Sequence, residues 1–283
     1  MLWKGRRQSE NVEDRRGITG RGVAVGGGLG ALALTIIVLL LGGNPEEVMQ
    51  NLQAPRSGGQ EQTRTLTAEE QELGEFVGVI LADTEDVWTQ VLQQQGVQYR
   101  EPKLVLFSQA TDSACGYAQS ATGPFYCSGD EKLYIDLEFF QEMQQKLGAR
   151  GDFAWAYVIA HEVGHHVQNL LGIEGQVREA RGRSSERDAN RLSVLLELQA
   201  DCLAGVWAYH ADRSRQVVEP GDIDEALNAA SQIGDDRLQK QGRGYVTPDS
   251  FTHGTSAQRA RWFRQGFATG EFGSCDTFAA KQL

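Results

Sequence analysis

The chain has 283 residues, enough for one sizeable domain with appendages, and its formal net charge of −11 argues against one class of partner. Residues 1–21 hold six Lys or Arg and three acidic residues, a net charge of +3, so the rest of the chain carries −14. Because an acidic domain binds nucleic acid poorly, we expect no nucleic-acid partner.

An uncharged segment follows the basic one. Residues 22–43 contain no charged side chain, and residues 23–41 consist mainly of Leu, Ile, Val, Ala and Gly, a length that spans a bilayer. The positive-inside rule keeps residues 1–21 in the cytoplasm. We therefore predict a single-pass transmembrane helix over residues 22–43 in the inner (cytoplasmic) membrane, with the domain that follows periplasmic, that is, extracytoplasmic. A cleaved signal peptide is the alternative, but its apolar core is usually shorter, and residues 41–44 make a poor cleavage site.

The folded domain is predicted to begin after a linker. Residues 44–66 are rich in Gln, Gly, Asn, Arg and Pro, a composition typical of a linker, so the domain comprises residues 67–283. The order of its elements predicts a mostly helical α+β fold with a small β-sheet. Strands are expected at residues 104–107 and 133–137, and helices at residues 67–95, 138–147, 152–171, 185–211, 222–233 and from about 256 onward.

Within the predicted helix over residues 152–171, His161, Glu162 and His165 form an H-E-x-x-H motif. Residues four apart share one face of a helix, so both imidazoles can bind one zinc ion, with Glu162 beside its open coordination position. The helix is apolar nearly all round before the motif, which predicts burial. Because unpaired polar side chains are costly in a buried helix, a metal explains their presence.

Zinc needs a third protein ligand, and the metzincin pattern is absent because Gln168 and Leu171 stand where it has Gly and His. Glu197 and Asp201 lie four apart in the predicted helix over residues 185–211, among Leu, Ala, Cys and Trp. We predict that Glu197 completes a His2Glu site and that Asp201 accepts a hydrogen bond from the outer ring N–H of a histidine ligand. The alternative is a solvated pair of acids, which is common on surface helices.

His253 and Arg259 belong to a loop that runs into the last predicted helix, which Thr255 or Ser256 would cap. His253 has two interpretations: a residue of the capping loop, or a donor to the oxyanion that forms when water attacks a carbonyl. His166 points about 100° away from His165 and is predicted to pack beside the site.

Three further local features are predicted around the motif helix. Asp152 and Asp222 are expected to cap the helices over residues 152–171 and 222–233. Gly172 is expected to end the motif helix in a left-handed conformation. Residues 172–184, rich in Gly, Arg and Glu, are predicted to form an exposed loop near the site.

The four cysteines fit an oxidising compartment. Cys115 and Cys127 flank a stretch that contains Gly and Pro, and Cys202, one residue after Asp201, is a candidate partner for Cys275. Three pairings are possible, and the sequence does not choose between them. Zinc ligation by the cysteines is disfavoured because no C-x-x-C occurs and the His2Glu set is complete.

Three segments of the chain resemble the bacterial neutral zinc metallopeptidase family, and the resemblance extends over nearly the whole chain, membrane segment included. It implies a gluzincin-like site, with two His and a Glu on zinc and an Asp four residues after that Glu. The third segment is also similar to the Thr-His-Pro…Arg segment of membrane-associated peptidases that process prenylated proteins. Substrate binding is thereby implied for His253 and Arg259, although Gly254 replaces the Pro. The resembling segments are residues 161–168, 197–205 and 253–259.

We therefore predict a membrane-anchored zinc metalloendopeptidase with a zincin-like domain that hydrolyses peptide bonds in a protein or peptide substrate. Zn²⁺ would lower the pKa of its bound water to about 7, Glu162 would act as general base, and His253 or Arg259 would stabilise the oxyanion. Two alternatives stand beside this prediction: a membrane-anchored binding or scaffold protein with a structural zinc, and a metallohydrolase acting on a non-peptide bond. The sequence predicts neither the substrate nor the oligomeric state.

Overall fold

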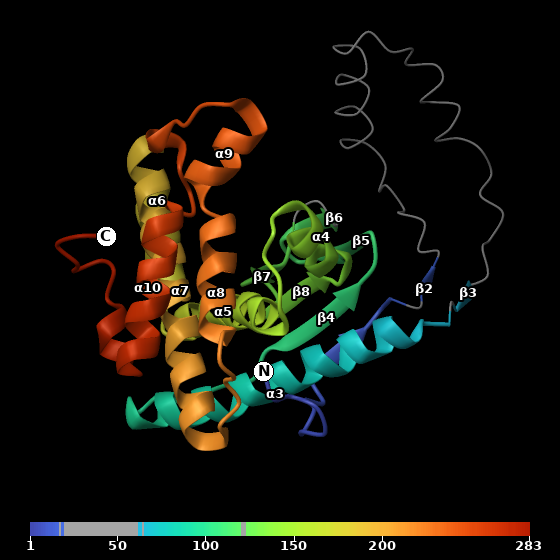
Figure 1. The fold of residues 1–283 in the computed structure, drawn as a ribbon. Helices are drawn as coiled ribbons and strands as arrows, with labels where there is room; N and C mark the ends of the chain where they lie inside the picture. Colours follow the sequence, from blue (N-terminus) through green and yellow to red (C-terminus); the bar gives the residue numbers. More distant parts are fainter. Residues whose placement is uncertain (17, 20–61, 64, 120–122) are drawn as a thin grey trace, which may run out of the picture. The chain divides into compact units, whose positions relative to one another are not determined.

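The computed structural model describes residues 1–16, 18–19, 62–63, 65–119 and 123–283 (Figure 1). The chain divides into two compact units: Met1–Arg15 with Thr67–Leu283, and Arg16–Leu66. The predicted transmembrane helix and most of the predicted linker lie outside the described residues. Within the described part, no helix is both long and apolar enough to cross a bilayer. In the smaller unit, β2 (Ile18–Thr19) pairs antiparallel with β3 (Gln62–Thr63).

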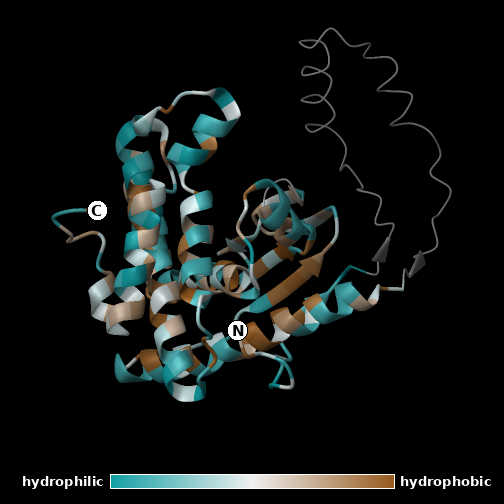
Figure 2. Ribbon diagram, viewed as in Figure 1, coloured by the Kyte–Doolittle hydropathy of each residue, from teal (hydrophilic) through white to brown (hydrophobic). Residues whose placement is uncertain are grey.

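The larger unit contains a small mixed sheet with the strand order β1-β4-β8-β7. Three neighbours are parallel, namely β1 (Val12–Asp14), β4 (Lys103–Phe107) and β8 (Lys132–Asp136). The fourth strand, β7 (Phe125–Cys127), runs antiparallel to β8 and forms one edge. The two strands predicted from the sequence are thereby confirmed as β4 and β8. β4 is hydrophobic along most of its length (Figure 2), and both strands are buried from their second residue onward.

Helices make up most of the rest of the larger unit, which confirms the predicted mostly helical α+β class. A capping box begins α3 (Ala68–Gln94): the Thr67 side chain accepts from the Glu70 amide, and the Glu70 side chain accepts from the Thr67 amide. Gly96 follows its end at φ 71°. The other α-helices are α4 (Glu138–Lys146), α5 (Asp152–Leu170), α6 (Ile173–Arg181), α7 (Glu186–Arg215), α8 (Asp222–Gln232), α9 (Asp235–Arg243) and α10 (Ser256–Thr269).

The central helix α7 packs against α5 on one side and α10 on another (Figure 1). Glycines allow these helices to approach closely. A Cβ atom on Gly164 of α5 would lie 3.1 Å from the carbonyl oxygen of Ala200, and one on Gly205 would lie 2.1 Å from the carbonyl oxygen of Phe263 in α10. The close crossings hold α7 in register with the helix that carries the H-E-x-x-H motif.

Two disulfides brace the larger unit, and together they account for all four cysteines. Cys115–Cys127 joins the turn between β5 (Ala110–Ser113) and β6 (Gly116–Gln119) to the end of β7. Cys202–Cys275 joins α7 to a C-terminal 3₁₀ helix (Phe272–Cys275). Of the three possible pairings, the structure shows this one.

Residues 1–15 belong to the larger unit. β1 extends the sheet beside β4, and Arg6 forms an ion pair with Asp83 of α3 at 2.9 Å. The N-terminal segment is thereby attached both to the sheet and to α3.

Two predicted helix caps are displaced by one residue. Asp152 and Asp222 are the first helical residues of α5 and α8, and the cap positions belong to Gly151 and Gly221. Both glycines have φ near +100°, a backbone conformation that an Asp rarely adopts. The predicted helix end at Gly172, with φ 74°, is confirmed.

The predicted loop over residues 172–184 is wrong, because most of it forms α6. Val177 is buried, and the oppositely charged pairs Glu174–Arg178 and Glu179–Arg183 lie four residues apart on the helix. Such pairs and one buried apolar side chain stabilise a helix whose glycines and charges suggest a loop. The sequence also gave no indication of the short, hydrophilic α9.

Candidate metal centre

The motif residues of α5 lie at a cleft of about 540 Å³. His161, Glu162 and His165 line it, and the first two are only 6% and 7% exposed. The preceding turns of α5 are buried in the core, which fixes the direction in which these side chains project. The motif helix therefore carries its polar residues to the wall of the cleft.

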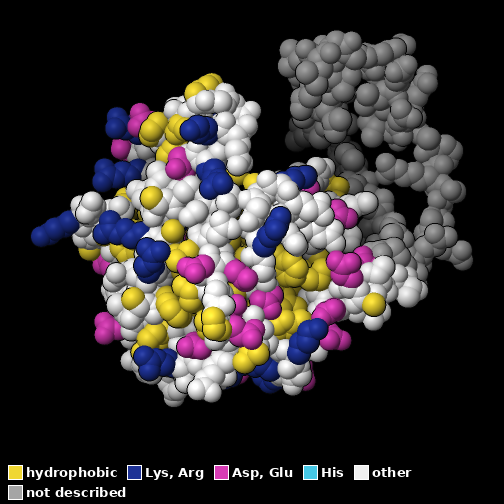
Figure 3. All heavy atoms as spheres, in the orientation of Figure 1, with side chains coloured by type: hydrophobic (Ala, Val, Ile, Leu, Met, Phe, Trp, Pro, Cys, Tyr) yellow, Lys and Arg dark blue, Asp and Glu magenta, His cyan; other side chains and the backbone are white. Residues whose placement is uncertain are grey.

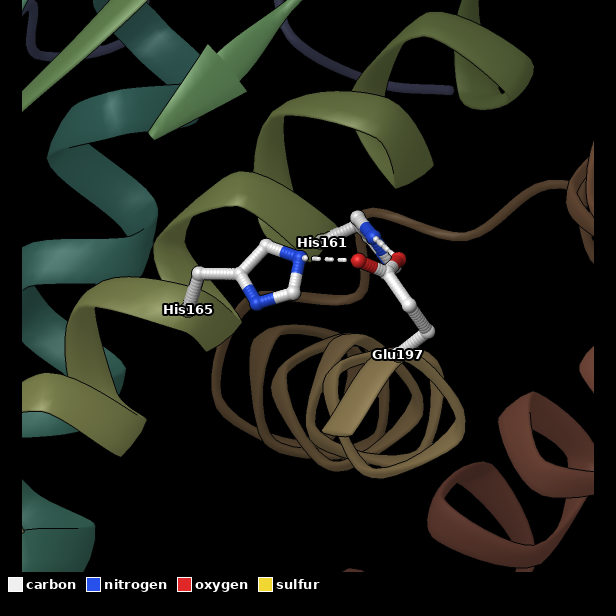
Figure 4. A group of neighbouring side chains, drawn as sticks. All are labelled: His161, His165 and Glu197. Atoms are coloured by element: carbon white, nitrogen blue, oxygen red, sulfur yellow. Dashed lines mark hydrogen bonds and ion pairs between the residues drawn. The ribbon is translucent and has the colours of Figure 1, made fainter. Parts of the chain in front are cut away.

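Glu197 of α7 meets both histidines (Figure 4). One carboxylate oxygen lies 3.1 Å from His161 Nε2, and the other lies 3.5 Å from His165 Nε2. One ligand atom from each of the three residues falls within 4.8 Å of the other two. Ligand atoms about 2.0–2.1 Å from a tetrahedral zinc ion lie about 3.3 Å apart. The spacing and the His2Glu donor set therefore fit zinc.

Asp201 lies on the outer side of His161. Its carboxylate is 2.9 Å from His161 Nδ1 and is fully buried. A proton on Nδ1 that is donated to Asp201 leaves the lone pair of Nε2 facing Glu197. The structure thus brings together all four residues that the sequence analysis assigned to the metal and its immediate surroundings, His161, His165, Glu197 and Asp201.

Arg259 is turned toward Asp201 and makes a two-pronged contact with it. Its Nε and one terminal nitrogen donate to the two carboxylate oxygens at 2.8 and 2.9 Å, and the side chain is 3% exposed. The same terminal nitrogen donates to the hydroxyl of Tyr157, which in turn donates to Asp201. These bonds hold Arg259 against Asp201, and Arg259 also lines the cleft.

Burial and charge act in opposite directions on the pKa values of these groups. Burial favours the neutral carboxyl of Glu197, but His165 and His161 hold its pKa well below the usual range. Burial likewise opposes a charge on His161, yet Asp201 and Glu197 raise its pKa to about 9. For Asp201, Arg259 outweighs burial and lowers the pKa. The site strongly favours positive charge beside its carboxylates.

The second histidine of the motif is held by a residue that the sequence analysis did not assign to the site. His165 Nδ1 lies 2.8 Å from the amide oxygen of Gln168, and the Gln168 amide nitrogen donates to the carbonyl of Leu196 and to the side chain of Gln199. Both histidines are therefore held through Nδ1 while Nε2 faces Glu197. Gln168 is fully buried one turn after His165. A polar residue one turn after a predicted metal ligand, on a helix predicted to be buried, is the signal in the sequence that could have assigned it to the site.

His253 lines the cleft and is held by Asp235, a second residue that the sequence analysis missed. One oxygen of Asp235 accepts from the backbone amides of Thr252, His253 and Gly254, and the other lies 3.4 Å from His253 Nδ1. The hydrogen bond that the His253 ring donates to Asp235 raises the pKa of His253. The side chain is 51% exposed, so it is accessible to a ligand in the cleft.

Gly254 is required by the loop around Asp235. Its φ is +94°, and its amide donates to Asp235 at 3.0 Å. A proline has neither that amide nor that φ. The departure from the Thr-His-Pro pattern therefore follows from how this chain holds His253.

His166, the residue after the motif, is fully buried and does not face Glu197. Its Nε2 lies 2.6 Å from the carbonyl of Arg100, and its Nδ1 lies 3.0 Å from the hydroxyl of Tyr126 in β7. Burial lowers its pKa, which favours the neutral ring. As predicted, His166 packs beside the site.

A second group of acids within the described residues, Asp152, Asp222 and Glu225, also has metal-like spacing. Two of them pair with the α-amino group of Met1, at 2.7 Å for Asp152 and 3.4 Å for Asp222. A cation of the chain itself therefore already contacts this group. It also lacks the nitrogen donors that zinc prefers.

Comparison with known proteins identifies the family of the chain. Residues 1–278 match the family described as "Putative neutral zinc metallopeptidase". The "Uncharacterized protein YpfJ" of Escherichia coli (strain K12) is 50% identical, with 98% of this chain and 99% of that protein aligned. The "Uncharacterized protein Mb2605" of Mycobacterium bovis is 46% identical over 65% of each chain. No solved structure matches. The chain belongs to this family of neutral zinc metallopeptidases.

Proposed function

We propose that this protein is a zinc-dependent endopeptidase with a zincin-like active site. The observation that carries the proposal is the convergence of His161, His165 and Glu197 at the cleft that Glu162 also lines. The carboxylates of Glu162, Glu197 and Asp201 and the guanidinium of Arg259 lie at or beside this cleft, so the group carries a net charge of −2 when both histidines are neutral. A divalent cation balances that charge.

Zinc held by His161, His165 and Glu197 would supply Lewis acidity, lowering the pKa of a coordinated water to about 7 and polarising the scissile carbonyl. Glu162 accepts the proton of the attacking water and delivers it to the leaving amine. His253, held by Asp235, donates a hydrogen bond to the developing oxyanion. Asp201 and Gln168 keep both imidazoles in the orientation that presents Nε2.

The experiment compares Glu162→Gln with wild type. The variant should retain stoichiometric zinc and lose about 10²- to 10⁴-fold in kcat on peptides, because it lacks only the proton acceptor. Glu174→Gln is the matched control, since Glu174 also lines the cleft but belongs to α6. Undiminished hydrolysis by Glu162→Gln would refute the assignment.

The same measurements separate the alternatives. A structural zinc in a binding or scaffold protein would be bound by four protein ligands, whereas three protein residues converge here at an open cleft. Screening the zinc-loaded protein against peptides and against non-peptide esters and amides, with chelation as control, distinguishes a peptidase from another metallohydrolase. Comparing new protein termini in the cell envelope of wild-type and Glu162→Gln cells would identify natural substrates.

We further propose that the domain works outside the cytoplasm and is tethered by the apolar segment over residues 22–43. Two disulfides support an oxidising compartment. Because residues 1–15 pack on the domain, they should lie on the same side of the membrane as the domain. Leu2→Cys and Tyr245→Cys, at exposed positions, should both react with a membrane-impermeant thiol reagent on cells whose outer barrier has been made permeable. Labelling of Tyr245→Cys alone would restore the predicted cytoplasmic N-terminus.

A further inference from the structure

The edge strand β7 lies beside the metal centre. Phe125 and Tyr126 line the same cleft as His161 and Glu162. β7 pairs with β8 on one side, and no described strand pairs with its other side. An edge of this kind can accept an extended peptide as an additional strand, with main-chain hydrogen bonds providing affinity.

A chain of hydrogen bonds ties this strand to the motif helix α5. The Tyr126 hydroxyl lies 3.0 Å from His166 Nδ1 and accepts a hydrogen bond from the Asn169 side-chain amide at 3.0 Å. His166 Nε2 lies 2.6 Å from the backbone carbonyl of Arg100. His166 directly follows His165, so the chain connects β7 to the helical turn that carries a proposed metal ligand.

The chemistry of the partners fixes the direction of these bonds. A backbone carbonyl only accepts, so His166 Nε2 carries the proton and donates to Arg100. In the neutral ring Nδ1 then accepts, so the Tyr126 hydroxyl donates to His166 while it accepts from Asn169. The phenol thus uses both its donor and its acceptor capacity against one helix, and its ring contacts the His166 ring at 5.3 Å between centroids.

Other contacts hold the rest of the strand without involving α5. The Phe125 ring stacks on Tyr134 of β8 at 4.9 Å between centroids, and Cys127 is bonded to Cys115. Tyr126 is therefore the residue of β7 whose side chain joins the strand to α5 through hydrogen bonds. Its hydroxyl sets how far the edge of the sheet lies from the metal centre.

We propose that Tyr126 is a positioning residue. It holds β7 at the distance from α5 at which a peptide paired with the free edge of β7 presents its scissile bond to Glu162. The proposal rests on the peptidase function proposed above and specifies its substrate class: a polypeptide segment extended over several residues. Short substrates that reach the metal centre without pairing with β7 do not depend on Tyr126.

The test is Tyr126→Phe, which removes the hydroxyl and keeps the ring. For quenched fluorescent peptides of about eight residues we expect KM to rise about 3- to 10-fold, because Tyr126→Phe removes both hydrogen bonds that join β7 to α5 and part of their combined contribution is lost from substrate binding. We expect kcat and zinc content to stay unchanged, and KM for blocked dipeptide substrates to stay unchanged as well. The split between KM and kcat and between long and short substrates separates positioning from general destabilisation.

Tyr134→Phe is the matched control. It removes a hydroxyl from the neighbouring strand, where Tyr134 donates to Asp130 at 2.7 Å, and should leave KM for long peptides unchanged. An unchanged KM in Tyr126→Phe, or an equal rise in both variants, would overturn the inference alone. Failure of the zinc-loaded wild-type protein to cleave any peptide would overturn the proposed function and this inference with it.

Discussion

Two groups of charges in the larger unit differ in how they are balanced. On α3, three acids face an equal number of arginines, two of them from the N-terminal segment. Between α5 and α7, three carboxylates lie near one guanidinium. The group on α3 is complete within the chain and holds the fold together, whereas the group at the cleft carries two more negative than positive charges when both histidines are neutral, an excess that a zinc ion would offset. The group on α3 comprises Asp83, Glu85 and Asp86 of that helix with their partners Arg6, Arg7 and Arg215.

Charge is also unevenly distributed over the surface of the larger unit. Lys and Arg gather over the part of the face in Figure 3 where Figure 1 shows α9 and α10, while Asp and Glu gather nearer its centre. The balance of a buried group therefore cannot be deduced from the charge of the chain as a whole. It has to be counted among the side chains that touch, and the following substitutions test that count.

Replacing a metal ligand should have the largest effect. Glu197→Gln removes one donor and one negative charge from the cleft, so zinc affinity should fall by more than about 100-fold, beyond the 10- to 100-fold typical of residues that only support a ligand. Competition with a chromogenic chelator measures the affinity. Thermal unfolding of the zinc-free variant should occur at or above the temperature of the zinc-free wild type, because a buried charge has been removed. Wild-type zinc affinity in this variant would show that the excess negative charge at the cleft does not determine metal binding.

The support of Asp201 by Arg259 should have the next largest effect. Arg259→Gln leaves a fully buried carboxylate without its cation, and we expect zinc affinity and kcat/KM to fall by about 10- to 100-fold. Arg259→Lys restores the charge but cannot reproduce the two-pronged contact, so it should recover part of the loss. If Arg259 instead bound the oxyanion, kcat would fall while zinc affinity stayed constant.

The metal centre could be predicted from the sequence because its spacing is local. The four-residue intervals His161–His165 and Glu197–Asp201 specify one helix face each, and the apolar context specifies burial. Gln168, Asp235 and Tyr157 were missed because their roles depend on contacts between elements. Asp235 meets His253 only because the Thr252–Gly254 loop folds around it.

The packing of the N-terminal segment could not be predicted for the same physical reason. Arg6 and Arg7 precede an uncharged segment, and this local pattern indicates a cytoplasmic flank. Their partners on α3 are 77 to 79 positions away in the chain, beyond the reach of any local pattern. β1 is only three residues long and pairs with β4, about ninety positions later, so its hydrophobic alternation is too short to recognise.

The complete group on α3 should affect stability and leave zinc binding unchanged. Glu85 is 3% exposed and accepts hydrogen bonds from Ser9, Asn11 and Arg7. Glu85→Gln weakens the attachment of the N-terminal segment and should lower the free energy of unfolding by about 1–3 kcal/mol. Urea unfolding and chelator competition on the same preparation check both parts. A change in zinc affinity would show that the two groups are coupled through α3 and α5.

Arg7→Gln should have the smallest effect. The Arg7 side chain is 53% exposed, so water and salt screen its contacts with Glu85 at 3.2 Å and Asp86 at 2.9 Å. Exposed pairs contribute about 0.2–1 kcal/mol, and the loss should shrink further at 0.5 M salt because the Debye length shortens. Thermal unfolding at low and high salt measures it. If Arg7→Gln cost as much as Glu85→Gln and did so at both salt concentrations, the attachment of residues 1–15 would depend on Arg7 itself. The smaller, salt-sensitive loss expected here means that β1 pairing and the buried hydrogen bonds to Glu85 hold the segment.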